Sequence, residues 1–231
     1  FKKGEHWRKH KPFWDKEYQT GQHLALSTNP SEDLIKFTHW LTREYGRRYL
    51  NPTTSVLDLG CGNGRNLLYL TKTFGPRGVG YDTSKEALAQ AKELSRGLPL
   101  EYQQRSIAEP LLVPTASQTL VLDMMTSHLL KETARENLHA EIARVLKPNG
   151  WLFFKTFLRE GDVHAERLLR EHPATEAGSY IHPKIGGVEH VFTEAEIATV
   201  LDEHFIIHRV TTSHRHYKRR SISVYAQRTT D

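Results

Sequence analysis

The stretch VLDLGCGNGRN at residues 56–66 decides the fold that this chain is expected to adopt. Its apolar start predicts a buried strand, which leads directly into glycines at positions 60, 62 and 64. Glycines lack a Cβ, so they permit a tight turn and let the backbone approach a ligand closely. A helix is expected to start at about residue 66, with its free N–H groups directed at the same place. The stretch therefore predicts a strand, a loop that binds a nucleotide-like ligand, and a helix.

The residues around the glycines narrow the choice of ligand. A dinucleotide fingerprint needs a glycine three places after its second glycine, and Arg65 occupies that place. Asp58, two places before the first glycine, would repel a diphosphate but suits a ligand with an ammonium group. A second acid, Asp82, closes the apolar run at 78–81. Either aspartate alone could be an N-cap or a turn residue, but the glycine loop, the acids and their spacing together favour a cofactor site.

This order of features resembles motif I, and the acid after the second strand, of the class I S-adenosylmethionine-dependent methyltransferases. The resemblance covers about residues 52–157 well and the end of the chain more loosely. It implies S-adenosyl-L-methionine as the cofactor, with the glycine loop at its methionyl end and Asp82 on its ribose hydroxyls. The residues expected to bind the cofactor are Asp58, Gly60, Cys61, Gly62, Asn63, Asp82, Thr83, Ser106, Ile107, Asp123 and Met124.

The sequence departs from the family pattern in two places. Where the family often has an acid for the adenine amino group, this chain has Ser106, followed by Ile107 to pack on the base. After the fourth strand it reads DMMTSH at 123–128 in place of the Asn/Asp-Pro-Pro-aromatic tetrad, which disfavours the adenine-N6 branch. The single cysteine, Cys61, is interpreted as a small apolar filler, which disfavours catalysis through a cysteine adduct.

The remaining pattern predicts an α/β fold, a three-layer doubly wound, mostly parallel seven-stranded sheet with an antiparallel C-terminal hairpin strand. The expected strands are 56–60, 78–82, 100–105, 119–125, 150–156, 205–212 and 221–228, and the expected helices are 65–74, 84–96 and 131–145. A turn at 147–150 is expected to open the fifth strand. Residues 51–231 would form the methyltransferase domain, with a helical lid or cover at 1–50 and an insertion at 159–191 over the substrate site.

Composition supports one domain and suggests the kind of acceptor. A length of 231 residues with 38% hydrophobic residues allows a sizeable core. Neither a membrane span nor a signal peptide is expected, so the expected location is cytoplasmic. Residues 1–18 hold six Lys/Arg against three acids, and residues 208–220 hold five Lys/Arg, three His and no acid. If both flank the site, they would attract an anionic small molecule or an RNA backbone, whereas a solvated basic loop is the plainer alternative.

The catalytic prediction is His128, which follows the fourth strand and should face the donor methyl group. The alternative is a packing histidine or one at a helix start. Histidine spacing of the zinc-binding type is not seen, so no metal site is predicted. Lid or acceptor contacts are expected from Trp14, Tyr18, Tyr180, His182, His190, Arg215, Lys218 and Arg219. For Trp14 and Tyr18, four residues apart, the alternative is an aromatic stripe that packs a helix on the sheet.

The sequence thus predicts a methyltransferase that acts on an oxygen or nitrogen of a polar or anionic small molecule. Two alternatives remain open at this point. One is an RNA methyltransferase that uses the basic N-terminal segment and the loop at 214–220. The other is a non-catalytic cofactor-binding protein with the same fold.

Overall fold

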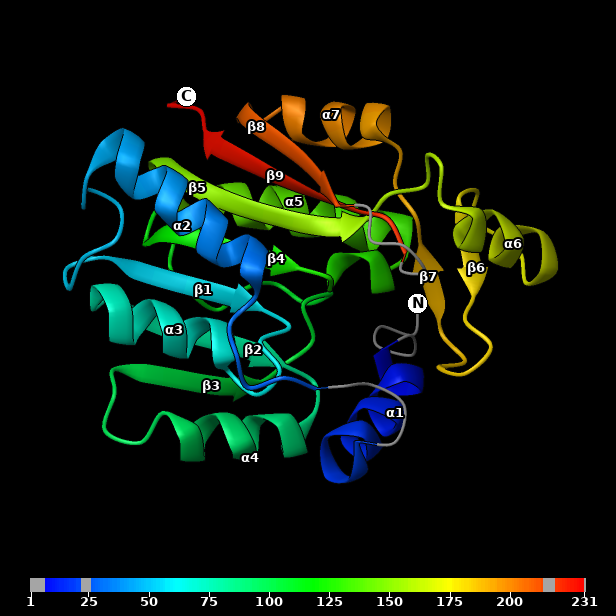
Figure 1. The fold of residues 1–231 in the computed structure, drawn as a ribbon, viewed down its shortest axis with the longest axis horizontal. Helices are drawn as coiled ribbons and strands as arrows, with labels where there is room; N and C mark the ends of the chain where they lie inside the picture. The colour runs from blue at the N-terminus through cyan, green and yellow to red at the C-terminus, as the bar shows by residue number, and fades with distance from the viewer. Residues whose placement is uncertain (1–6, 22–25, 214–218, 231) are drawn as a thin grey trace.

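The computed structural model describes residues 7–21, 26–213 and 219–230. Its centre is a seven-stranded sheet with the strand order β3-β2-β1-β4-β5-β9-β8 (Figure 1). The strands are β1 (Ser55–Leu59), β2 (Arg77–Asp82), β3 (Leu100–Gln104), β4 (Gln118–Met124), β5 (Leu146–Phe157), β8 (Phe205–Ser213) and β9 (Ser221–Arg228). The pairs from β3 to β5 are parallel, and β9 is antiparallel to both of its neighbours. The predicted mostly parallel sheet with an antiparallel C-terminal hairpin is confirmed.

Helices cover both faces of this sheet. On one face α2 (Glu32–Tyr45), α3 (Arg65–Phe74) and α4 (Lys85–Leu94) contribute to one core cluster, and on the other α5 (Glu132–Val145) and α7 (Glu194–Asp202) contribute to a second. The five residues of β1 are all buried, as expected for a parallel strand between two helical layers. Ser84 caps α4 by accepting the N–H of Ala87, and Thr193 and Glu196 form a capping box at α7.

The fifth strand differs from the prediction at its start. The structure continues β5 back to Leu146, so the expected turn at 147–150 lies inside the strand as an irregularity. Asn149 takes a positive φ of 62° there, and the register with β4 shifts between Gln118 and Leu120. The turn chemistry of 147–150 is therefore used to bulge a paired strand and does not end the pairing.

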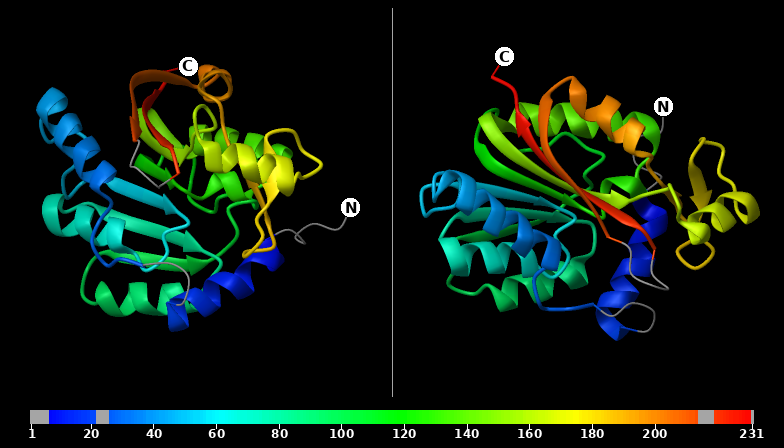
Figure 2. Two further views of the ribbon diagram at one scale, coloured as in Figure 1. Left: turned by 45° about the vertical axis from the view of Figure 1, so that its right-hand side comes forward. Right: turned by 45° about the horizontal axis from the view of Figure 1, so that its top comes forward.

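The segment between β5 and α7 contains α6 (Val163–Glu171) and a small antiparallel sheet of β6 (Ser179–Ile181) and β7 (Val188–His190). Strands of three residues are too short to show an alternating pattern, so the sequence predicted an insertion here but none of its strands. Together with α1 (Trp7–Thr20), this segment lies beyond the carboxyl ends of the parallel strands (Figure 2). Among the described residues, no helix is both long and apolar enough to span a bilayer.

Candidate functional site

The glycine loop turns back onto β2 and leaves room for other groups to approach it. The N–H groups of Gly60 and Cys61 both donate to the carbonyl of Tyr81, at 2.8 and 2.9 Å. Gly60, Gly62 and Gly64 take φ values of +71°, +55° and +75°, a region that disfavours side chains. A Cβ at Gly62 would overlap the hydroxyl of Tyr18. The loop therefore needs glycine both for its backbone conformation and for the close approach of a neighbouring side chain.

Asp82 ties the end of β2 to this loop. Its Oδ2 accepts the N–H of Gly62 at 2.9 Å, and its Oδ1 accepts the N–H of Ser84 at 2.8 Å. Burial raises the pKa of Asp82, while the N–H groups of Ser84 and Gly62 act in the opposite direction. Because Ser84 caps α4, Asp82 is not an N-cap, but its bond to the N–H of Ser84, two residues later, is a turn contact of the kind that the plainer interpretation also allowed. Asp82 fixes the loop and also lines the adjoining cavity.

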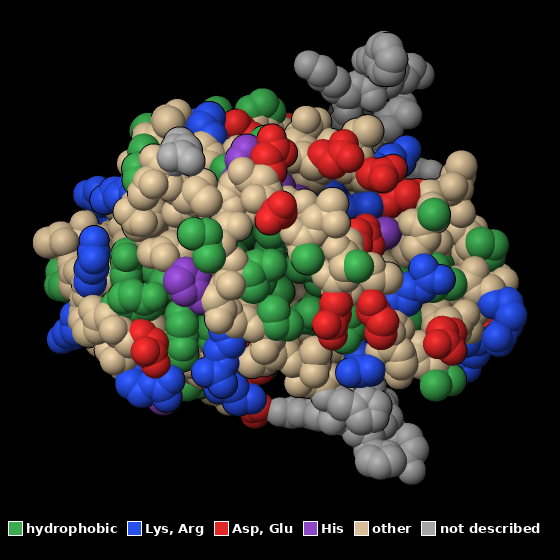
Figure 3. Space-filling model, turned by 90° about the horizontal axis from the view of Figure 1, so that it is seen from above, with side chains coloured by type: hydrophobic (Ala, Val, Ile, Leu, Met, Phe, Trp, Pro, Cys, Tyr) green, Lys and Arg blue, Asp and Glu red, His purple; other side chains and the backbone are tan. Residues whose placement is uncertain are grey.

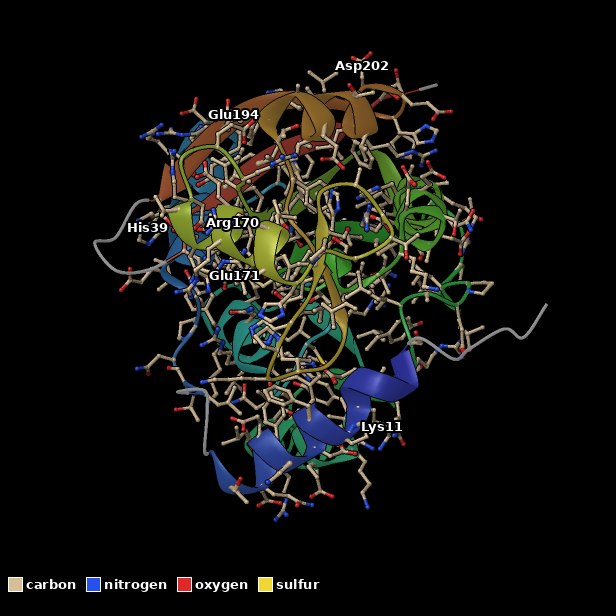
Figure 4. All side chains as sticks on the ribbon, turned by 90° about the vertical axis from the view of Figure 1, so that its right-hand side faces the viewer. Lys11, His39, Arg170, Glu171, Glu194 and Asp202 are labelled. Atoms are coloured by element: carbon tan, nitrogen blue, oxygen red, sulfur yellow. The ribbon has the colours of Figure 1, made fainter. Side chains whose placement is uncertain are left out.

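The cavity runs along the carboxyl edge of the sheet, from the end of β2 past β1 to the ends of β4 and β5. It brings together most of the residues expected to bind the cofactor or to cover it. Those that line it are Trp14, Tyr18, Gly60, Cys61, Gly62, Asn63, Asp82, Thr83, Ser106, Ile107 and Met124. Asp58, Asp123 and His128 lie outside this set. Figure 4 looks at this edge and shows α1, with Lys11, at the lower right and α2, with His39, at the left.

Two buried carboxyl groups lie behind the cavity wall. Asp58 is 1% exposed, and no described donor lies within hydrogen-bond distance of its Oδ2. Burial first, and then the negative charges of Asp82 and Asp123, raise the pKa of Asp58 to about 7, although Arg65 acts in the opposite direction. Burial also raises the pKa of Asp123 to about 6, and one of its oxygens accepts the N–H of Ser127 at 3.1 Å. A role for either in cofactor binding stays a prediction.

The cavity wall includes residues that the sequence did not single out. They are Leu26, Ser27, Ser31, Arg65, Asn66, Arg105, Met125, Thr126, Leu129, Leu130 and Lys155. Two asparagines, one in the glycine loop and one at the start of α3, hold the segment that precedes α2. Asn63 Nδ2 donates to Ser27 O at 3.3 Å, and Asn66 Oδ1 accepts from Ser31 N at 3.1 Å. Lys155 could have been found from strand order, because it stands opposite Met124 where β4 and β5 end. The contacts of the serines depend on chain segments some 35 residues apart, which no local pattern reveals.

The helix α1 covers the cavity and is fastened to α4. Ser84 Oγ donates to Asp15 Oδ1 at 2.7 Å, and Gln90 Nε2 donates to the carbonyl of Tyr18 at 2.7 Å. Burial, and then the nearby Asp82, raise the pKa of the Tyr18 phenol well above its usual range. Trp14 and Tyr18 thus face the cavity rather than the sheet, which is the placement expected of a lid.

The acceptor residues Tyr180 and His190, expected from the insertion, and Arg219, expected from the basic C-terminal loop, occupy a different region. Tyr180 donates to Glu189, and Arg219 donates to Tyr180 while its guanidinium lies 3.7 Å from the ring centre of Phe157. His190 is 3% exposed and sits between Ser179 Oγ at 2.8 Å and Glu196 Oε1 at 2.6 Å. These groups fasten the insertion to the sheet and to α7, outside the cavity wall.

Four further predicted residues lie near these contacts or outside the described part of the chain. His182 accepts the N–H groups of Lys184 and Ile185 through Nδ1, at 3.2 and 3.1 Å. His128 is buried in the short 3-10 helix η1 (Ser127–Leu129), with its ring 5.2 Å from that of Phe157. Arg215 and Lys218 lie outside the described residues. A role in the reaction remains a prediction for all four.

Comparisons with known proteins agree with this architecture. A family model described as a methyltransferase domain matches residues 56–150. A fatty-acid O-methyltransferase from Mycolicibacterium smegmatis is 25% identical over 158 residues, which are 68% of this chain and 57% of that protein. The chain covers less than two thirds of the length of this and other curated relatives that it matches.

Two solved structures have a similar fold. A methyltransferase from Methanosarcina mazei, described as S-adenosylmethionine-dependent, has a TM-score of 0.68 and 25% identity, covering 80% of this chain and 97% of its own. The 1,6-didemethyltoxoflavin-N1-methyltransferase of Burkholderia thailandensis, solved with its named substrate and S-adenosylhomocysteine, has a TM-score of 0.70 and 19% identity. That match covers 96% of this chain and 88% of the other.

Proposed function

Because this chain belongs to the class I S-adenosylmethionine-dependent methyltransferases, whose cofactor is S-adenosyl-L-methionine, we propose that it methylates an oxygen or nitrogen of a polar or anionic small molecule. One observation carries the proposal most directly. The hydrogen bond from Gly62 to Asp82 joins the glycine loop to the acid expected at the ribose, and both line one cavity.

The residues of the cavity fit the parts of the cofactor. Asp82 would accept hydrogen bonds from the ribose hydroxyls of the cofactor. The backbone of Gly60–Asn63 would lie along the methionyl end, and Ser106 and Ile107 would contact the adenine base. The cofactor supplies a methyl group on a positively charged sulfur, so the chain mainly has to align the acceptor and exclude water. The helix α1 supports the second task because Trp14 and Tyr18 close one side of the cavity.

The proton released by an oxygen or nitrogen acceptor needs a base, for which His128 is the proposal. It adjoins Leu129, a residue of the cavity wall, along η1. If His128 accepts the proton, substitution by Gln lowers kcat, while affinity for S-adenosylhomocysteine is unchanged. A kcat of the wild-type value in His128→Gln would assign the histidine to packing against Phe157.

Calorimetry with S-adenosylhomocysteine tests the cofactor assignment. The wild-type chain should bind it, and Asp82→Ala should bind at least tenfold more weakly because the ribose contacts and the Gly62 bond are both lost. Glu101→Ala, at an exposed position of β3, is a control that should bind as the wild type does. Absence of binding to the wild-type chain would overturn the proposed function.

Transfer of a labelled methyl group to a cell extract, separated into small-molecule, RNA and protein fractions, tests the acceptor class. Label in the small-molecule fraction is expected. Label confined to RNA, with an affinity that falls steeply with salt, would favour the RNA alternative suggested by the basic segments. Binding of S-adenosylhomocysteine without labelled product in any fraction would favour the non-catalytic alternative.

A further inference from the structure

An ion pair lies between the cofactor cavity, at the carboxyl edge of the sheet, and a second cavity on the face that α2 covers. Lys155 Nζ lies 2.5 Å from Asp33 Oδ2, and the two side chains are 18% and 19% exposed. Lys155 lines the cofactor cavity, whereas Asp33 lines the second one, which we call the α2–β8 groove. The groove lies between α2 and strands β8 and β9, and its wall includes Arg209 and Tyr225.

Positive charge predominates in the α2–β8 groove. Lys36, His39 and Arg43 are spaced three and four residues apart, which places them on one face of α2. Arg209 faces them from β8. The carboxylate of the wall, Asp33, is already shared, because Lys36 lies 3.5 Å from its Oδ1 and Lys155 holds its Oδ2. Even with Arg43 paired to Glu44 at 2.7 Å, the groove keeps an excess of cations. Figure 3 shows Lys and Arg side chains gathered at the lower left of the face that it views.

Hydroxyl groups complete the polar wall on the sheet side. They belong to Thr211, Ser213 and Ser223, which share one face of β8 and β9. Ser223 stands directly opposite Lys155 in the register of β5 and β9, so the hydroxyl side of the groove meets the cofactor cavity at that lysine. Hydroxyl donors combined with lysine and arginine are a donor set suited to the oxygens of a phosphate or carboxylate.

The aromatic residues of the groove favour a small anion over RNA. The ring of Trp40 packs against Trp151 and Tyr225, at centroid distances of 5.2 and 5.1 Å, and Tyr225 packs against Phe37 at 4.9 Å. These rings belong to the packing between α2 and the sheet. Binding of single-stranded RNA uses aromatic faces open to stacked bases, and the rings of this groove are engaged with one another.

The order of strands sets the direction from cofactor to groove. Along the carboxyl edge come β2 with Asp82, β1 with the glycine loop, β4 with Met124, and β5 with Lys155. Three strand spacings separate the first from the last, roughly 14 Å. Lys155 therefore stands at the end of the cavity opposite the acid expected at the ribose. From Lys36 to Arg43 the groove continues for seven helical residues, about 10 Å.

We propose that the α2–β8 groove binds the anionic group, a carboxylate or phosphate, of the acceptor whose reacting atom lies in the cofactor cavity. Lys155, which lines the cofactor cavity, and Asp33, which lines the groove, form the ion pair at the boundary that this acceptor would span. This inference rests on the proposed function, because it names the class of acceptor and the place where its charge is held.

The test compares two doubly substituted chains that lose the same charge. Lys36→Gln/Arg209→Gln removes two cations of the groove, and Lys72→Gln/Lys92→Gln removes two exposed lysines of α3 and α4. Each is saturated with S-adenosylhomocysteine and titrated with inorganic phosphate or succinate against chloride at constant ionic strength. We expect either anion to raise the thermal midpoint of the wild type and of the α3/α4 variant, and this rise to be lost in the groove variant. The inference is overturned if phosphate and succinate raise the thermal midpoint of the wild type no more than chloride does.

Methyl transfer to the small-molecule fraction of a cell extract gives the second readout. The groove variant should lose at least tenfold in rate, its affinity for S-adenosylhomocysteine should stay within twofold of the wild type, and the labelled product should be retained on an anion-exchange resin. Wild-type rates in the groove variant, or a product that passes the resin, overturn the inference and leave the proposed function intact. Failure of the wild type to bind S-adenosylhomocysteine removes the proposed function itself.

Discussion

Single residues around the glycine loop show how closely the backbone and its neighbours fit. The three glycines stand against Thr126, Tyr18 and Tyr102 in turn, so each position excludes a Cβ for a different reason. Behind the loop, the buried carboxyl of Asp58 lacks a described donor at one oxygen. The loop thus has a backbone conformation that glycine adopts without strain, and it lies in front of the Asp58 carboxyl, whose charged form burial disfavours.

Substitution of Gly62 tests the close approach of Tyr18. Gly62→Ala places a methyl group against the Tyr18 hydroxyl and keeps a φ of +55°, so we expect a loss of roughly 1–3 kcal/mol in the free energy of unfolding. Tyr18→Phe removes the hydroxyl, and the double variant should regain part of that loss. Denaturant unfolding of the four chains measures the coupling. Strict additivity would show that Tyr18 moves aside freely.

Asp58 gives a dependence of stability on pH. Its folded pKa of about 7 lies above the usual aspartate value of 3.8, so the folded state binds the proton more tightly. Its contribution is fully present below about pH 4 and is lost as the pH rises toward 7, by at most about 4 kcal/mol. Asp58→Asn should therefore be less sensitive to pH between 5 and 8 in denaturant unfolding. An unchanged slope in Asp58→Asn would contradict the raised pKa.

At the scale of elements, contacts between segments distant in sequence build the site. The helix α1 is joined to α4 by Asp15 and by Tyr18, and the segment before α2 is joined to the glycine loop by Asn63 and Asn66. Turn residues predicted the ends of α3 closely, and alternation of side chains predicted the ends of β8 and β9. The start of β5 was predicted wrongly, because pairing with β4 overrides the turn preference of 147–150.

The fastening of α1 can be weakened at one contact. Asp15→Ala removes the acceptor of the Ser84 hydroxyl and the partner of Lys11, at a cost of about 1 kcal/mol in docking. We expect faster dissociation of S-adenosylhomocysteine, roughly fivefold, in stopped-flow measurements. Lys16→Ala, an exposed position on the same helix, should leave the rate unchanged. Equal rates in Asp15→Ala and wild type would mean that α1 does not retain the ligand.

At the scale of the whole molecule, the stability of the fold at acidic pH depends on a histidine that does not line the cavity. His139 of α5 is 4% exposed and packs edge-on against Phe154. Burial, and then the charges of Arg135 and His204, lower its pKa to about 4. Because the folded state disfavours the proton, the contribution of His139 is present above about pH 6.5 and is lost as the pH falls toward 4. This dependence has the opposite sign to that of Asp58.

Replacement of His139 by Leu should remove this acid sensitivity. The variant keeps an apolar side chain against Phe154, so we expect its free energy of unfolding at pH 5 to exceed that of the wild type by roughly 1–3 kcal/mol. At pH 8 the two should differ by less than about 1 kcal/mol. Thermal unfolding of both chains at pH 5 and pH 8 checks this prediction. If the variant and the wild type differ in the free energy of unfolding by the same amount at both pH values, the effect is due to packing alone.

The sequence by itself determined the parallel sheet, the glycine loop and the acid at Asp82, because apolar strand runs, turn chemistry and glycine conformations are properties of contiguous residues. Tertiary structure alone decided which side chains share the cavity. It drew in Lys155, Thr126 and Ser27, and it placed Tyr180, His190 and Arg219 in the contacts that hold the insertion. The order of neighbouring strands and the docking of helices bring these residues together, and such contacts join positions whose separation along the chain carries no periodic signal.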